Sequence, residues 1–194
     1  RLYVQGPAGT DALPYDALIL ATGATDRVLP VPGWTKPGVF TLGGAQVLLK
    51  DQGCLIGSRV VFCGSSPLLY LAALQYRQMG GEVAAVLDTS SFMEKALAFK
   101  DLSASLPTLR RGLGYMARLR AGGIPIKLGV RLLSFDGDSR VNGVTYAQGS
   151  GPPHQIACDA VAFGFGLRAE TQLAELAGGK LAFDPVYRQW LPAA

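Results

Sequence analysis

Three positions between residues 59 and 88 have the types and spacing needed to hold a diphosphate and a ribose. An apolar run ends at Gly64, a helix-like run starts at Pro67, and a second apolar run ends at Asp88, 24 residues after Gly64. A glycine turn at a helix tip presents N–H groups to phosphate, and an acid about 20 residues on accepts from ribose hydroxyls. The spacing predicts a Rossmann-type strand–helix–strand unit that binds an adenine nucleotide.

The glycine fingerprint of this unit is incomplete. Gly64 keeps the first glycine of G-x-G-x-x-G, while Ser66 and Leu69 stand at the second and third positions. Ser66 adds a Cβ where the backbone approaches the diphosphate, and Leu69 is expected to push the helix away from the strand. A carboxylate at Asp88 favours NAD over NADP, because it repels a 2′-phosphate. A working nucleotide site and a Rossmann unit kept as scaffold are both open.

Composition and charge indicate a globular protein. The chain has 194 residues, 49% of them hydrophobic and 16% charged, which suits one domain or one compact domain with appendages. The net charge is +4, and four arginines cluster at Arg110, Arg111, Arg118 and Arg120. Because no nucleic-acid motif accompanies them, we interpret them as a solvated helix face and expect no nucleic-acid partner.

The cysteines give no metal or disulfide pattern. Cys54, Cys63 and Cys158 are widely spaced, no C-x-x-C pair occurs, and His154 is the only histidine. We therefore expect no metal site and a reducing, cytoplasmic location, with Cys63 buried in a strand. The sequence shows no apolar run near the roughly 18 residues needed to cross a membrane, so we expect no transmembrane segment.

The hydrophobic patterns predict an α/β fold. Its expected form is a Rossmann-like parallel sheet with helices on both faces and a small antiparallel β-meander. Besides the unit at 59–88, strands are expected at 2–5, 17–21, 124–128, 130–135, 141–147 and 155–163. Helices are expected at 45–50, 107–120 and 170–177, with an ambiguous helical rhythm at 90–106.

Several segments together resemble a known family. They read ALILATGAT, LPVPGW, PGVFT, RVVFCGSSPLLYLAA and DAVAFGFGLRAET. The combination resembles the pyridine-nucleotide-disulfide-oxidoreductase-like flavoproteins. Within them, PGWTKPGVFTLGGAQVLLK is similar to the flavin-linked subunits of opine oxidases, hydrogen cyanide synthase and amine or amino-acid dehydrogenases.

The resemblance implies a domain organisation. Such proteins hold FAD in one domain, into which a second Rossmann-like domain of NAD(P)-binding type is inserted. Residues 1–30 would then be a connecting strand from a missing FAD domain, 31–164 the inserted domain, and 165–194 the return segment. The chain looks like a piece of a longer protein, so FAD is expected in the full-length protein and not on this fragment.

The resemblance also assigns residues to the cofactors. Gly64, Ser65 and Ser66 would face phosphate, and Asp88 the ribose, of NAD(P) or another adenine nucleotide. Gly23 and Gly164 would lie where the chain crosses between domains, either close to a flavin or as simple crossover turns. The chain has no pair of redox cysteines, so dithiol chemistry is not expected.

The first functional hypothesis is a fragment of a flavin-dependent oxidoreductase that acts on the C–N bond of an amine-type substrate within a multi-subunit complex. No catalytic residue is predicted on the fragment, which is expected to be inactive alone. We interpret His154 as an exposed loop histidine, Asp159 as a strand-end cap, and Tyr70 and Tyr76 as packing groups.

Two alternatives come from other classes of function. The domain could be a non-catalytic scaffold that binds a nucleotide or docks another subunit. It could also be an NADH-dependent flavin reductase domain. The incomplete fingerprint predicts that NADH binds with millimolar affinity or worse, whereas a flavin reductase should bind it at micromolar concentrations.

Overall fold

The protein is described by a computed structural model covering residues 1–95 and 106–193. The chain separates into two compact units. Unit 1 comprises Arg1–Thr25 and Arg168–Ala194, and unit 2 comprises Asp26–Leu167. Every buried hydrophobic side chain in the described residues belongs to the range 31–163, so the hydrophobic core lies in unit 2.

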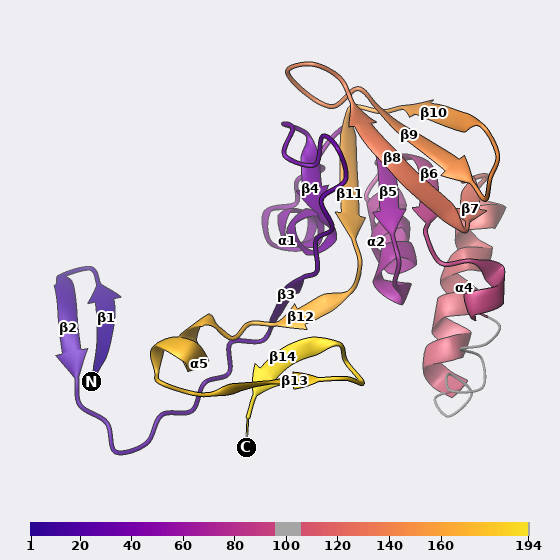
Figure 1. Cartoon of the computed structure of the whole chain (residues 1–194). Helices are drawn as coiled ribbons and strands as arrows, with labels where there is room; N and C mark the ends of the chain where they lie inside the picture. Colours follow the sequence, from indigo (N-terminus) through magenta and orange to yellow (C-terminus); the bar gives the residue numbers. More distant parts are fainter. Residues whose placement is uncertain (96–105, 194) are drawn as a thin grey trace. The chain divides into compact units, whose positions relative to one another are not determined.

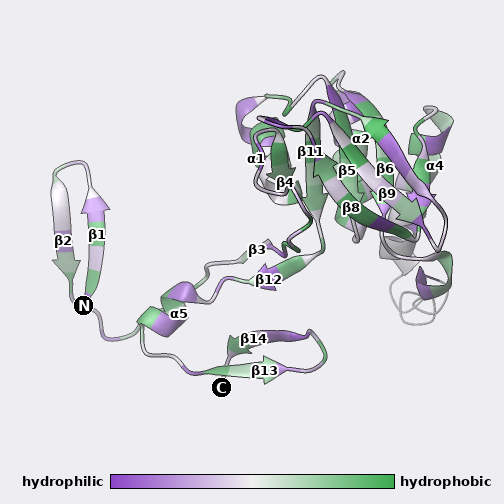
Figure 2. Cartoon of the chain, turned by 45° about the horizontal axis from the view of Figure 1, so that its top comes forward, coloured by the Kyte–Doolittle hydropathy of each residue, from purple (hydrophilic) through white to green (hydrophobic). Residues whose placement is uncertain are grey.

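Unit 2 is built on a parallel sheet with the strand order β4–β11–β5–β6–β7 (Figure 1). Its strands are β4 (Val39–Thr41), β5 (Arg59–Gly64), β6 (Glu82–Asp88), β7 (Ile126–Leu128) and β11 (Ala160–Gly164). The returning strand β11 pairs with both β4 and β5, although about 120 and 100 residues, respectively, separate it from them in sequence. Figure 2 shows the hydrophobic residues that run along these strands, as expected when both faces of a sheet are covered.

Helices cover one face of this sheet, and a small antiparallel sheet covers the other (Figure 1). The helices are α1 (Leu42–Gln52), α2 (Pro67–Gln78) and α4 (Leu106–Ala121). The antiparallel meander has the order β10–β9–β8 and comprises β8 (Val130–Asp136), β9 (Gly143–Gln148) and β10 (Pro153–Ala157).

Strand β5 shows how the two cores arise. Val60 and Phe62 join the helix-side core, while Val61 and Cys63 join the core beneath the meander. Successive residues of a strand point to opposite faces, so one apolar run supplies both layers. Cys63 is fully buried, as predicted.

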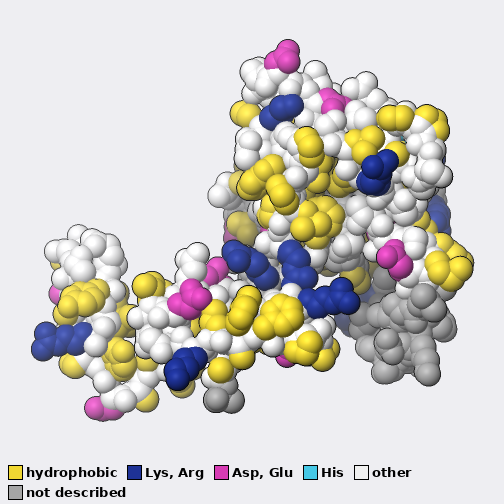
Figure 3. All heavy atoms as spheres, in the orientation of Figure 1, with side chains coloured by type: hydrophobic (Ala, Val, Ile, Leu, Met, Phe, Trp, Pro, Cys, Tyr) yellow, Lys and Arg dark blue, Asp and Glu magenta, His cyan; other side chains and the backbone are white. Residues whose placement is uncertain are grey.

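Unit 1 contains short elements with little burial. They are the hairpin β1 (Leu2–Gly6) and β2 (Gly9–Leu13), helix α5 (Gln172–Leu176), and the hairpin β13 (Leu181–Asp184) and β14 (Gln189–Pro192). Strand β3 (Ala24–Asp26) pairs with β12 (Leu167–Ala169). Phe183 and Trp190 pack edge to face at 5.7 Å between ring centroids, yet stay 52% and 59% exposed. Figure 3 shows hydrophobic side chains on the surface of this second hairpin.

The predicted α/β class, with its parallel sheet and meander, is confirmed. In the described residues the second face of the sheet is covered by the meander rather than by helices. The helices predicted at 45–50, 107–120 and 170–177 are found as α1, α4 and α5. Of the ambiguous stretch 90–106, residues 92–95 are helical, and 96–105 lie outside the described residues.

Two strand predictions are wrong. The stretch 155–163 is two strands, because the chain leaves the meander after Ala157 and enters the parallel sheet at Ala160. Residues 17–21 form no strand, and Ile19 is 91% exposed. Their apolar pattern resembles that of a covered strand, but no described residues of this chain pair with them.

Candidate nucleotide-binding site

The residues predicted to hold a nucleotide converge at the carboxyl end of the parallel sheet. Gly164 of β11 is in register with Gly64 of β5, and Gly64 is in register with Asp88 of β6. Ser65 and Ser66 follow Gly64 and lead into α2, which begins at Pro67. Ligands of open α/β sheets bind beyond this edge, at the helix N-termini. Spacing predicted that Gly64, Ser65, Ser66 and Asp88 lie together, whereas Gly164 was expected only at a crossover between domains.

Gly64 makes a turn that no other residue fits. Its φ is +133°, and a Cβ added there would lie 1.8 Å from the carbonyl oxygen of Gly164. The N–H of Ser65 donates to that same oxygen at 3.0 Å, and the N–H of Thr89 donates to the carbonyl of Gly64 at 2.8 Å. The turn thus connects all three neighbouring strand ends.

Ser66 leaves a polar atom without a partner at the tip of α2. It is the N-cap residue, but its side chain makes no capping hydrogen bond. Its Oγ is buried and has no hydrogen-bond partner among the described residues. A buried hydroxyl at a helix N-terminus can donate to a phosphate oxygen, and the positive end of the helix dipole favours that charge. This turn fits a diphosphate.

The side chain of Leu69 packs in the hydrophobic core. At the third fingerprint position, its side chain is fully buried in the cluster that joins α1, α2 and the sheet. A glycine there would permit closer packing of helix and strand. The leucine instead contributes about 1.5–3 kcal/mol of hydrophobic burial, so the departure from the fingerprint is explained by packing.

Asp88 does not face a ribose. The residue has no exposed surface, and its carboxylate is held from three directions. Tyr70 of α2 donates its hydroxyl to Oδ2, the Lys95 ammonium lies 2.7 Å from the same oxygen, and the Ser90 N–H donates to Oδ1 at 2.7 Å. The ribose role of Asp88 was predicted only from its spacing after Gly64. In the structure its carboxylate forms an internal ion pair with Lys95.

Tyr70 and Lys95 belong to this cluster, and sequence reasoning missed both. Burial, followed by the hydrogen bond to Asp88, raises the pKa of Tyr70 well above its usual value, so the phenol remains a donor. The Lys95 ammonium also lies 5.3 Å from the centre of the Tyr70 ring. Tyr70 is therefore more than the packing group we expected, and its place in the first turn of α2, facing the end of β6, was the available signal.

The chain's residues fit an adenine nucleotide only in part. The turn at Gly64 and the orphaned Oγ of Ser66 suit a diphosphate. The acid that should hold the ribose is buried and already satisfied, so the ribose half of NAD(P) does not fit this arrangement.

A second helix tip near the same edge is occupied by side chains of the chain itself. The N–H of Gly43, in the first turn of α1, donates to Oδ2 of Asp26 at 2.8 Å, and that of Gly44 donates to Thr41 Oγ1 at 3.1 Å. These two acceptors satisfy N–H groups that a helix N-terminus leaves unpaired. No signal in the sequence indicated that Asp26 would reach a helix 17 residues away.

Gly23 stands apart from the group. It belongs to unit 1, has φ +73° and has open space around the position of a Cβ. The other glycine-containing strand-to-helix junction in the described residues, from β4 to Gly43 and Gly44 of α1, has these tip N–H groups paired with Asp26 and Thr41, so it does not fit a flavin diphosphate. The role of Gly23 beside a flavin stays a prediction.

The remaining candidates are structural in the described residues. Asp159 accepts the N–H groups of Ser58 and Arg59 at 2.9 and 2.8 Å, as the predicted strand-end cap should. His154 is exposed, as predicted, but lies on β10 rather than in a loop. Tyr76 packs against Phe62 and donates to the carbonyl of Gly57 at 3.5 Å.

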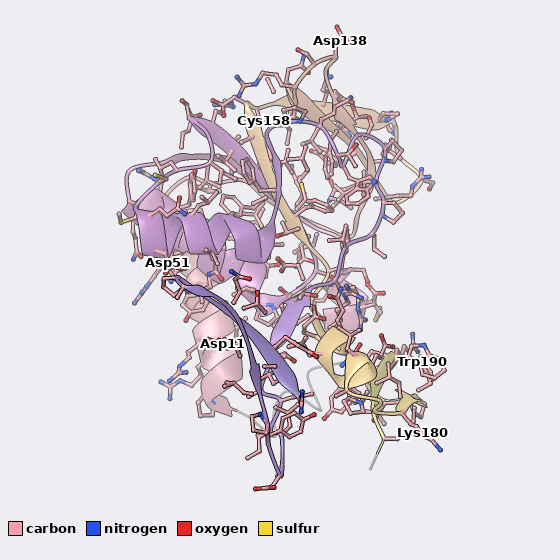
Figure 4. The ribbon with its side chains drawn as sticks, turned by 90° about the vertical axis from the view of Figure 1, so that its left-hand side faces the viewer. Asp11, Asp51, Asp138, Cys158, Lys180 and Trp190 are labelled. Carbon is pink, nitrogen blue, oxygen red and sulfur yellow. The ribbon has the colours of Figure 1, made fainter. Side chains whose placement is uncertain are left out.

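Cys63 and Cys158 have the character of buried groups rather than of nucleophiles. Burial raises the pKa of Cys63 well above its usual value, and it raises that of Cys158 to about 12. Figure 4 shows Cys158 inside unit 2, whereas Cys54 is exposed. All three are free thiols, and the described residues include no cluster of His, Cys, Asp and Glu that could hold a metal ion.

Residues 3–185 match the model of the family described as pyridine nucleotide-disulphide oxidoreductase. The chain belongs to this family. The family and its relatives are FAD/NAD(P)-linked oxidoreductases. No described helix of this family member is long and apolar enough to span a membrane.

Curated relatives of this oxidoreductase family come from bacteria. An opine oxidase subunit of Agrobacterium tumefaciens (strain Ach5) is 35% identical over 179 residues, which cover 91% of this chain and 35% of the relative. Hydrogen cyanide synthase subunit HcnB of Pseudomonas protegens is 31% identical over 182 residues, covering 90% and 39%. The chain therefore spans little more than a third of the length of these two relatives.

A solved structure has the same fold. The ferredoxin reductase for the CYP199A2 system from Rhodopseudomonas palustris aligns with a TM-score of 0.64 at 27% identity. The alignment covers 93% of this chain and 41% of that protein. The expected family membership is thereby confirmed.

Proposed function

We propose that the chain supplies the nucleotide-binding-type domain of a flavin-dependent dehydrogenase that acts on the C–N bond of an amine-type substrate. FAD is held by another part of the full-length protein, where it accepts a hydride from the substrate. The similarity to HcnB and to the opine oxidase subunit over about nine-tenths of the chain supports this class. Both relatives are named as subunits, which supports action within a complex.

The observation that carries the proposal is the state of Asp88. A domain that accepts electrons from NAD(P)H needs a carboxylate or a cation open to the adenosine ribose. Here the carboxylate is buried against Tyr70 and Lys95. An amine dehydrogenase draws its electrons from the amine, so it retains this domain without needing nicotinamide.

The test compares electron donors on the intact enzyme. The full-length protein, purified with its partner subunits, should reduce an artificial dye when supplied with amines, opines or amino acids. NADH and NADPH should support little dye reduction, and calorimetric titration should give dissociation constants in the millimolar range or weaker. Rapid reduction by NADH, with micromolar binding and no response to amines, would refute the proposal.

A second candidate is a scaffold that binds a nucleotide without catalysis. The orphaned Oγ of Ser66 and the glycine turn favour it, because they suit a diphosphate whether or not a ribose is held by Asp88. Titration with ADP and AMP separates the two candidates. Binding of ADP that is lost in Ser66→Ala, in an enzyme unresponsive to amines, would support the scaffold.

The third candidate, an NADH-dependent flavin reductase, draws support from one relative. Rhodocoxin reductase of Rhodococcus erythropolis is 34% identical over 170 residues, which cover 86% of this chain and 36% of that protein. The same NADH titration decides this case, since a reductase must bind NADH at working concentrations.

A further inference from the structure

The net charge of this chain resides on one helix. The sequence has 18 lysines and arginines against 14 aspartates and glutamates. Helix α4 carries four of the cations, Arg110, Arg111, Arg118 and Arg120, and no lysine or acidic residue. The rest of the chain therefore holds 14 charges of each sign, and the excess of +4 is the charge of α4.

All four arginines are exposed. The opposite side of α4 packs inward, where Leu119 is fully buried and Tyr115 and Met116 join the helix-side core. In Figure 4, side chains ending in nitrogen atoms project outward from this helix. We call this outward surface, formed by the four arginines with Leu113 and Ala117, the arginine face.

Among the described residues, the arginine face has no internal counter-ions. Elsewhere Arg59 pairs with Glu82, and Lys95 pairs with Asp88. Within the described part of the chain, no carboxylate lies within ion-pair distance of the α4 arginines. The charge of Arg120 opposes the rise in the pKa of Tyr70.

Helix stability accounts for only half of this pattern. Arg118 and Arg120 lie in the last turn, where cations stabilise the helix dipole. Arg110 and Arg111 lie in the N-terminal half, where the dipole offers them no advantage. A helix face that only contacts solvent could equally carry a mixture of lysine and glutamate. Such a mixture would add stabilising ion pairs between residues three or four positions apart.

The face has the anatomy of a protein interface. At 100° per residue, Arg110, Leu113 and Ala117 share the outward stripe, bordered by Arg120 on one side and by Arg111 and Arg118 on the other. Leu113 is 56% exposed. Arginine is enriched at protein interfaces, where its guanidinium pairs bidentately with carboxylates and its stem covers apolar surface.

We propose that the arginine face docks a carboxylate-rich surface of a partner protein in the same enzyme. The inference rests on the proposed function in one respect only, since the multi-subunit complex supplies the partner. Complementary charge steers such an encounter and fixes its register. A nucleic acid would also complement the positive charge. The exposed Leu113 in the stripe and the absence of a nucleic-acid motif in the sequence favour a protein partner.

The test is charge reversal on the assembled enzyme. Arg110→Glu, Arg111→Glu and Arg118→Glu are combined in the full-length protein, which is co-expressed with the other subunits of its complex. The matched control combines Lys50→Glu, Arg131→Glu and Arg140→Glu, which make the same charge change at exposed positions away from α4. Sedimentation velocity measures the dissociation constant, and circular dichroism verifies that both variants fold.

Reversal on α4 should weaken assembly of the complex about tenfold or more at about 0.15 M salt, with little change in the control. Raising the salt should weaken the unmodified complex toward the same level. Equal effects of the two variants, or none, would overturn the proposal. So would binding of a DNA duplex or of phosphatidylserine vesicles that depends on α4 while assembly of the complex does not.

The outcome is separable from that of the proposed function. Donor preference, amine against NADH, is read on the unmodified complex and is independent of the α4 variants. An enzyme reduced by NADH whose assembly needs the arginine face would refute the function and leave the docking surface intact. An enzyme that is reduced by amines and assembles equally well with the α4 charge reversal would support the proposed function and refute the docking surface.

Discussion

At the scale of single residues, Asp88 is a carboxylate at the position expected to bind a ribose, but its partners are groups of the protein itself. The carboxylate that would accept a ribose hydroxyl instead accepts Tyr70, Lys95 and the Ser90 N–H. A buried charge is costly unless it is paired. The lysine and tyrosine therefore make Asp88 a stabilising element of the Rossmann unit.

The ion pair predicts an asymmetry between two substitutions. Lys95→Met leaves a fully buried carboxylate with one fewer partner and should cost about 2–4 kcal/mol of unfolding free energy. Asp88→Asn should cost less, because the Lys95 side chain is 32% exposed and can turn to water. Urea denaturation measures both, and the double variant should recover part of the loss of Lys95→Met. Equal or reversed costs would contradict the buried ion pair.

A side chain at Gly64 would collide with its surroundings, which is not the case at every glycine with a positive φ. Gly64→Ala places a Cβ 1.8 Å from the Gly164 oxygen and should destabilise the protein by at least about 3 kcal/mol. Gly80 is the control, since it has φ +86° but nothing within 4 Å of an added Cβ. Gly80→Ala should cost only about 1 kcal/mol. Thermal unfolding of the two variants separates steric collision from backbone strain. Similar losses of stability in both variants would argue against the collision.

At the scale of elements, an acid joins the start of two neighbouring strands. Asp159, just before β11, accepts the N–H groups of Ser58 and Arg59 at the start of β5. Partial burial works against ionisation, but these N–H donors prevail and lower the pKa of Asp159 below its usual value. The carboxylate form is therefore the one that stabilises the sheet.

This lowered pKa gives a pH dependence. The folded-state pKa lies below the unfolded value of about 3.9, so the stabilisation is complete above that value. It is lost as the pH falls through the lower, folded-state pKa. Asp159→Asn should cost stability at neutral pH and flatten the acid limb of the unfolding free energy. Denaturation curves from pH 7 down to about pH 2 test this, and identical acid limbs would disprove it.

At the scale of the whole molecule, the two units differ in what holds them together. Unit 2 contains every buried hydrophobic side chain of the described chain, in two clusters on the two faces of one sheet. Unit 1 is made of hairpins and a short helix whose apolar residues, such as Leu176 at 84%, remain exposed. Burial of apolar surface is the main source of stability, so the stability of the chain belongs to unit 2.

Residues 26–167 should therefore fold without the rest. A protein of this length should unfold cooperatively, with a midpoint within a few degrees of the longer chain. Heat denaturation followed by circular dichroism gives both midpoints. A fragment that is unfolded, or that melts without cooperativity, would show that unit 1 contributes stability that its exposed residues do not indicate.

The sequence by itself determined the fold class and indicated that four site residues lie together. Apolar runs and glycine turns are local signals, and parallel strands bring their carboxyl ends to one edge, so Gly64, Ser65, Ser66 and Asp88 were expected to lie together. The pairing that brings Gly164 beside Gly64 came from the structure. The sequence could not divide 155–163 into two strands, since the pattern continues while the pairing partner changes. Nor could it tell that residues 17–21 lack a partner, because pairing is not a property of the run itself.

Only the tertiary structure decided what each of these groups faces. Tyr70 is 18 residues from Asp88 along the chain, and Asp26 is 17 residues from the helix tip it caps. Such contacts depend on side-chain directions after packing, which no spacing encodes. The same holds for α4, where periodicity indicated a helix but packing determined that the side bearing its arginines is turned outward.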